Sequence, residues 1–191
     1  METALKQDSL QIHYTLNEED FLNLQLYHAF KNEDFKKQRI KDKYRIIGLS
    51  LLCGLILFFD GYFSIYSYYF LGSAVLFFIV HPWWSKWFYK RLLKSKVINA
   101  NKDCFPQTTT LILQDKQIDL INNKNSHTFD IHNLLNIEEI QEYFFLQISN
   151  FPPIIIPKRQ IPNINLIQKQ LKQYNKNFDI SFITDLEYRW K

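Results

Sequence analysis

Two apolar blocks separated by a short polar break constrain this chain more than any other feature. They cover Ile46–Phe59 and Tyr62–Val80, and Asp60 is the only charged residue between their outer ends. A helix needs about 20 mostly apolar residues to cross a bilayer. Interfacial side chains extend the blocks to Tyr44–Tyr62 and Tyr66–Trp84, each about 28 Å long at about 1.5 Å per residue. We therefore predict a transmembrane helical hairpin with spans 44–62 and 66–84.

Aromatic residues gather at both ends of the predicted spans. Three of the four tryptophans, Trp83, Trp84 and Trp87, follow Pro82 closely, and Tyr and Phe crowd the turn between the spans. Tryptophan and tyrosine favour the level of the lipid headgroups. The alternative is a helical hairpin buried in a soluble α-domain. It would have to hide a nearly uncharged stretch inside a chain that otherwise reads as β-rich, so we favour the membrane interpretation.

Basic residues flank the hairpin on both sides and are missing from its turn. They are Lys36, Lys37, Arg39, Lys41, Lys43 and Arg45 before it, and Lys86, Lys90, Arg91, Lys94 and Lys96 after it. The positive-inside rule places both flanks, and hence both termini, in the cytoplasm and the turn outside. The flanks would also contact anionic lipid headgroups. We therefore predict a multi-pass protein of the inner (cytoplasmic) membrane.

Charge and cysteine usage exclude other classes of protein. The net charge is +4, but outside the flanks the charge is nearly balanced, so no nucleic-acid partner is expected. Two cysteines, Cys53 and Cys104, argue against a disulfide framework or a zinc site. Met1–Ser9 lacks the basic and apolar regions of a cleavable signal peptide, so the first span is expected to direct insertion.

The segment before the hairpin predicts a strand followed by a helix. Apolar and polar residues alternate over Leu10–Leu16, which is typical of a half-buried strand. Asn17 can cap a helix, with Asp20 in the capping-box position. This helix either continues into the first span or breaks near Asn32 and Asp34.

The segment after the hairpin predicts a small antiparallel β domain closed by a C-terminal helix. Its six short strands are expected at Thr108–Leu113, Gln117–Ile121, Ser126–Phe129, Asn136–Gln141, Tyr143–Ser149 and Ile154–Ile156. Asp130–Leu135 can form a single helical turn. The helix opens at Pro162-Asn163 and places Ile164, Ile167, Leu171 and Tyr174 on one face. The tail, Phe178–Lys191, reads as either a strand or a docked segment.

The predicted fold class is therefore an α+β membrane protein in three parts. Residues 1–43 hold the cytoplasmic strand and helix, residues 44–84 the transmembrane hairpin, and residues 99–191 the cytoplasmic β domain with its C-terminal helix and tail.

Three stretches resemble the YcxB-like family of bacterial membrane proteins. They are the strand and acidic helix start at Tyr14–Phe21, the run Tyr143–Leu146, and the aliphatic-Pro-Lys stretch Ile155–Arg159. The paired membrane segments lie between them, and the resemblance spans roughly residues 10 to 174. It implies a C-terminal domain similar to bacterial pleckstrin-homology-like folds, and it implies no established activity.

Little in the sequence indicates chemistry. All four glycines lie in the hairpin, which argues against a glycine-loop nucleotide site. His127 and His132 lack a compact metal-ligand spacing. We therefore predict no catalytic residue, metal or cofactor. An acidic run, Glu138, Glu139 and Glu142, reads as solvated strand positions.

Lys158 and Arg159 are the candidate contact residues. They follow an apolar strand and a proline turn. Either they contact an anionic group, such as a lipid headgroup or an acidic partner, or they form a solvated turn whose basic residues face the membrane.

Three functions remain open from the sequence. The favoured one is a non-enzymatic membrane protein whose cytoplasmic domain binds a protein partner, still unidentified, or senses a signal. The second is an immunity protein that neutralises a toxin at the membrane, an argument by analogy. The third, a small transporter or membrane-enzyme subunit, would need polar groups in the bilayer, where the spans offer few.

Overall fold

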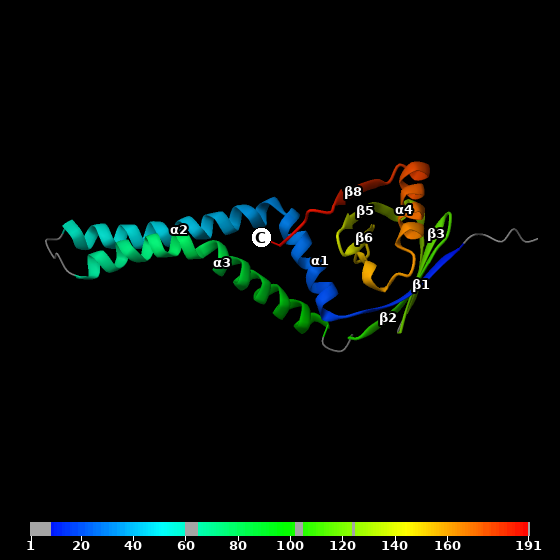
Figure 1. Ribbon diagram of the computed structural model, residues 1–191, viewed down its shortest axis with the longest axis horizontal. Coiled ribbons are helices and arrows are strands. Elements are labelled where there is room, and N and C mark those ends of the chain that lie inside the picture. Colours follow the sequence, from blue (N-terminus) through cyan, green and yellow to red (C-terminus); the bar gives the residue numbers. More distant parts are fainter. Residues whose placement is uncertain (1–8, 60–64, 102–104, 124, 191) are drawn as a thin grey trace, which may run out of the picture. The chain divides into compact units, whose positions relative to one another are not determined.

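The computed structural model describes residues 9–59, 65–101, 105–123 and 125–190 of the chain (Figure 1). It is an α+β protein, as predicted. The helices are α1 (Glu18–Lys31), α2 (Glu33–Phe59), α3 (Ile65–Asn101) and α4 (Ile164–Phe178), with short 3-10 turns η1 (Ile131–Asn133) and η2 (Lys158–Gln160). The strands are β1 (Leu10–Leu16), β2 (Gln107–Leu113), β3 (Gln117–Asn122), β4 (Ser126–Asp130), β5 (Leu134–Ile140), β6 (Tyr143–Ile148), β7 (Ile154–Pro157) and β8 (Ser181–Asp185).

The chain divides into two compact units. The first, which holds the strands, comprises residues 1–24 and 97–189; the second, which holds α2 and most of α3, comprises residues 25–96 and 190–191.

The first sheet of the β-rich unit is antiparallel, in the order β1-β2-β3-β4. Its alternating apolar residues, such as Ile12 on β1 and Leu111 on β2, are buried on one face. β1 precedes the two long helices in the sequence, yet it pairs with β2, which follows them. The side-chain amide of Gln160 accepts a hydrogen bond from the backbone N–H of Thr15 and donates one to its C=O. These bonds occupy part of the outer edge of β1, which would otherwise be open to another strand.

The second sheet has the order β7-β6-β5-β8, and here the antiparallel prediction is wrong in part. β5, β6 and β7 pair antiparallel, but β8 runs parallel to β5. The physical reason is that α4 separates β8 from the preceding strands, and a connection of that length allows a parallel return. The helix therefore does not close the domain, and the tail supplies a strand, one of the two alternatives predicted for it.

The apolar face predicted for α4 is confirmed at three of its four residues. Ile167, Leu171 and Tyr174 are buried, whereas Ile164 is 38% exposed. The hydroxyl of Tyr174 donates a hydrogen bond of 2.6 Å to the backbone oxygen of Gln114, between β2 and β3.

The first two helices are separated by a break at Asn32, one of the two alternatives. One half of the predicted capping box is present at the start of α1, where the carboxylate of Asp20 accepts the Asn17 N–H at 2.8 Å, and the Asp20 N–H bonds the backbone oxygen of Asn17. At the start of α2, the side-chain oxygen of Asn32 accepts the N–H of Phe35 at 3.0 Å.

Within the second unit, α2 and α3 run antiparallel, side by side (Figure 1). The two helices pack tightly at the buried Gly54, where an added Cβ would lie 3.0 Å from the side chain of Leu71. Among the described residues, one helical stretch, Ile65–Asn99, is long and apolar enough to cross a bilayer. The predicted turn around Asp60 lies outside the described residues.

Candidate functional site: an aromatic groove on the helix pair

The long helices expose their apolar side chains rather than burying them. On α2 the exposed residues include Leu49, Leu51, Leu52, Leu55, Ile56 and Phe59. On α3 they include Tyr66, Tyr68, Tyr69, Val75, Leu76, Phe78, Ile79, Val80, Trp83, Trp84, Trp87 and Phe88. Soluble monomers rarely leave contiguous apolar patches of more than a few hundred Å² uncovered. This surface therefore needs a partner, either lipid or protein.

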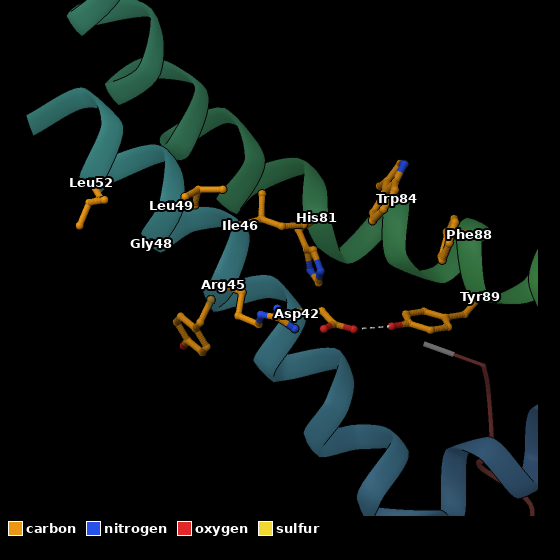
Figure 2. A pocket seen from close by; sticks show the side chains of 11 residues that line it. Asp42, Arg45, Ile46, Gly48, Leu49, Leu52, His81, Trp84, Phe88 and Tyr89 are labelled. Carbon is orange, nitrogen blue, oxygen red and sulfur yellow. Dashed lines mark hydrogen bonds between the residues drawn. The ribbon is translucent and has the colours of Figure 1, made fainter. Parts of the chain in front are cut away.

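A groove of about 720 Å³ lies on the same helix pair. Figure 2 shows that one end is formed by aliphatic residues of α2, including Ile46, Leu49 and Leu52. At the other end, Asp42 of α2 faces Tyr89 of α3. The remaining lining residues are Tyr44, Arg45, Gly48, His81, Trp84 and Phe88.

The polar end of the groove is held by contacts between the helices. The Tyr89 hydroxyl donates to the Asp42 carboxylate at 3.2 Å, and the Arg39 guanidinium donates to the Ser85 hydroxyl at 3.2 Å. The ammonium of Lys43 lies 4.0 Å from the centre of the Phe78 ring. These contacts join α2 to α3 in the parts of the two helices that carry the predicted basic flanks.

Both basic flanks are helical, and the antiparallel pairing brings them to the same end of the pair. Lys36 forms an ion pair with Glu33 at 2.8 Å, and this hydrogen bond lowers the pKa of the Glu33 carboxyl. The guanidinium of Arg91 lies 5.3 Å from the Trp87 ring. An aliphatic stretch that ends in aromatic and cationic side chains is the pattern of a headgroup boundary.

The predicted contact residues Lys158 and Arg159 both have partners inside the β-rich unit. The Lys158 ammonium lies 2.7 Å from the Glu139 carboxylate, and the two side chains are only 11% and 4% exposed. The amide of Gln168 also donates to Glu139. An external anionic contact at these positions stays a prediction.

Arg159 lies in a second network, around Asp20. Its guanidinium forms an ion pair with the fully buried Asp20 carboxylate: Nη2 donates a hydrogen bond of 2.9 Å to Oδ2, and Nη1 lies 2.8 Å from Oδ1. The Tyr143 hydroxyl donates to Asp20 at 2.8 Å and accepts from Asn23 at 3.1 Å. Burial raises the pKa of Tyr143 to about 12, and the hydrogen bond to Asp20 raises the pKa of Arg159. One carboxylate thus caps α1 and ties that helix to β6 and η2.

The prediction that the acidic run is solvated is wrong for two of its three residues. Glu138 and Glu139 are 7% and 3% exposed, so they are not solvated strand positions; only Glu142 is exposed. Local spacing could not predict the partners of Glu139, because Lys158 and Gln168 lie 19 and 29 residues away in the sequence.

The histidines are not brought together. His127 stacks near Phe129 and Phe151, while the ring of His132 lies against Phe178. In the described part of the chain, no group of three or more His, Cys, Asp or Glu side chains could hold a metal ion.

Comparisons with family models, with curated proteins and with solved structures found no match to this chain. The resemblance to the YcxB-like family therefore stays a prediction.

Proposed function

We propose that the chain is a membrane-anchored binding protein of the inner membrane, held by α3 with α2 as its antiparallel partner. The observation that carries the proposal is the apolar surface of the two helices, exposed in residues such as Leu76 and Ile79. Lipid tails would cover the apolar side chains all around the helix pair, whereas a protein partner would cover them on one side.

The described part of α2 supports a span less directly than α3 does. Its apolar run ends at Phe59, the last described residue before the turn, and begins after Arg45. Two features still favour a hairpin in the bilayer. Gly54 allows close packing against α3, and exposed leucines continue along the outer side of α2.

The direction of insertion follows from the charge asymmetry. The two cationic flanks lie at one end of the helix pair, and moving each cation through the bilayer centre would cost about 2.5–3.5 kcal/mol. We therefore propose that both flanks and the β-rich unit face the cytoplasm.

We further infer a binding role rather than a catalytic one. Two of the buried carboxylates, those of Asp20 and Glu139, are each paired with a cationic side chain, which suits a structural role more than proton transfer. Turnover of a metabolite by the purified protein, lost on one side-chain change, would refute this. The partner could be captured from detergent-solubilised membranes.

Topology provides the decisive test. In a background with Cys53→Ser and Cys104→Ser, single cysteines are placed at Ser64, between the apolar segments, and at the exposed Asn125. A membrane-impermeant maleimide should label Ser64→Cys in intact spheroplasts, and label Asn125→Cys only after lysis. Labelling at Asn125 without lysis would overturn the orientation, and recovery of the protein in the soluble fraction without detergent would overturn the anchor.

A further inference from the structure

A small cavity of about 180 Å³ lies in the β-rich unit, at one end of the buried face of the first sheet. Its walls come from β1, β2 and β3, from Phe21 of α1, and from the segment 151–155 around β7. The cavity is lined by apolar side chains and by the uncharged polar residues Tyr14, Gln107, Thr109 and Asn122, with no charged residue among those that the structure describes.

Three of these polar residues form a row across the sheet. Tyr14 on β1 is the cross-strand partner of Thr109 on β2, and Thr109 is the partner of Asn122 on β3. Cross-strand partners point to the same face of a sheet. The next positions on that face are apolar, namely Leu111 on β2 and Leu120 on β3. The polar row therefore lies next to the apolar, core-forming part of the same face of the first sheet.

The polar atoms of this row are buried and lack hydrogen-bond partners. They are the hydroxyls of Tyr14 and Thr109 and the side-chain oxygen of Asn122, with no partner among the described residues. Tyr14 is 3% exposed and Thr109 is 1% exposed. Burial also raises the pKa of Tyr14.

The other fully buried tyrosines of this unit behave differently. The hydroxyls of Tyr143 and Tyr174 donate hydrogen bonds of 2.8 and 2.6 Å. Buried polar groups in native proteins are nearly always satisfied, so three unsatisfied ones around one cavity need an explanation.

We propose that this cavity binds an uncharged small molecule with a single aromatic ring and one hydroxyl group. A cavity of about 150 Å³ accepts a benzene-sized ligand, which matches the volume here. Phe21, Phe151 and Pro152 provide an apolar wall for the ring. The ligand hydroxyl donates to the oxygen of Asn122 and accepts from the hydroxyl of Thr109 or Tyr14.

The described lining residues carry no charge, and this selects against ionised ligands, because a buried charge without a counter-charge is strongly disfavoured. The inference does not depend on the membrane proposal, since the cavity lies wholly within the β-rich unit.

The test uses the full-length protein in detergent micelles and two probes, 4-fluorophenol and fluorobenzene, followed by ¹⁹F NMR against protein-free micelles. The variant Thr109→Val replaces the buried hydroxyl by a methyl group of similar shape. Its matched control is Thr108→Val, at the neighbouring exposed position of β2. We expect 4-fluorophenol to bind the parent protein, and Thr109→Val to weaken it about fivefold, the value of one neutral hydrogen bond. Fluorobenzene binding should not weaken.

Two results would overturn the proposal. If neither probe binds the parent protein, the three polar atoms form their hydrogen bonds with ordered water and not with a ligand. If Thr109→Val weakens both probes equally, or no more than Thr108→Val does, the row does not recognise the hydroxyl. Amide hydrogen exchange of β2 and β3 checks that each variant is folded. Tyr14→Phe provides a second removal of a hydroxyl and should also weaken 4-fluorophenol selectively.

Discussion

Removing Arg159 should destabilise the β-rich unit more than neutralising its partner Asp20. In the native protein, the guanidinium and the carboxylate form a two-pronged ion pair. The two partners differ in their access to water. The Asp20 side chain is 0% exposed, whereas the Arg159 side chain is 47% exposed.

This difference determines the expected magnitudes. Arg159→Met leaves a buried carboxylate without its cation, and breaking a buried pair in this way costs about 3–5 kcal/mol. Asp20→Asn leaves a guanidinium that water can reach, and the new amide still accepts one hydrogen bond. We expect this variant to lose about 1–2 kcal/mol, mostly from weaker capping and hydrogen bonding.

The assay is amide hydrogen exchange of β5 and β6 in the full-length protein in micelles, because it reports the opening of this unit separately. The control is Arg189→Met, a matched change at an exposed position, which should have little effect. The double variant Asp20→Asn with Arg159→Met should be more stable than Arg159→Met alone. If Asp20→Asn proves the more damaging single change, or if the double variant is the least stable, the reasoning from burial is refuted.

Two further predictions concern pH and helix packing. Burial raises the pKa of Tyr174 to about 12, so its contribution to stability is complete below about pH 10, the unfolded value, and is lost as the pH rises toward 12. Between pH 10 and 12 the free energy of unfolding should fall less steeply with pH in Tyr174→Phe than in the parent protein, by at most about 1.4 kcal/mol per pH unit. Urea unfolding at several pH values measures this slope, and equal slopes for the two proteins would contradict the prediction. Gly54→Val should destabilise the helix pair by about 1–3 kcal/mol, because its Cβ meets Leu71. Gly72→Val, with no atom within 4 Å of the added Cβ, is the control, and equal thermal shifts of the two variants in detergent would contradict the packing argument.

Most of the secondary structure could be predicted because it follows local periodicity. Leu10–Leu16 alternates, and the structure forms β1 over the same residues. The amphipathic spacing of α4 places Ile167, Leu171 and Tyr174 in the core. These patterns need no knowledge of distant partners.

The missed features depend on residues far apart in the sequence. The parallel pairing of β8 with β5 joins Ser181 to Asn136, and no local signal specifies it. Asp20 was identified as a cap, but its partner Arg159 lies 139 residues away. The polar row of the cavity was missed for the same reason, because Tyr14, Thr109 and Asn122 become neighbours only when the sheet forms.

The pairing of β1 with β2 also has a consequence for biosynthesis. His13 and Thr110 are cross-strand partners separated by 97 residues. At about 5–20 residues per second, the ribosome needs about 5–20 s to make the intervening chain. Throughout that interval β1 has no strand to pair with, and unpaired strands promote aggregation. Under the membrane anchoring proposed above, the nascent chain inserts its helices before β1 can pair, so delayed insertion would lengthen the period in which the unpaired strand can aggregate.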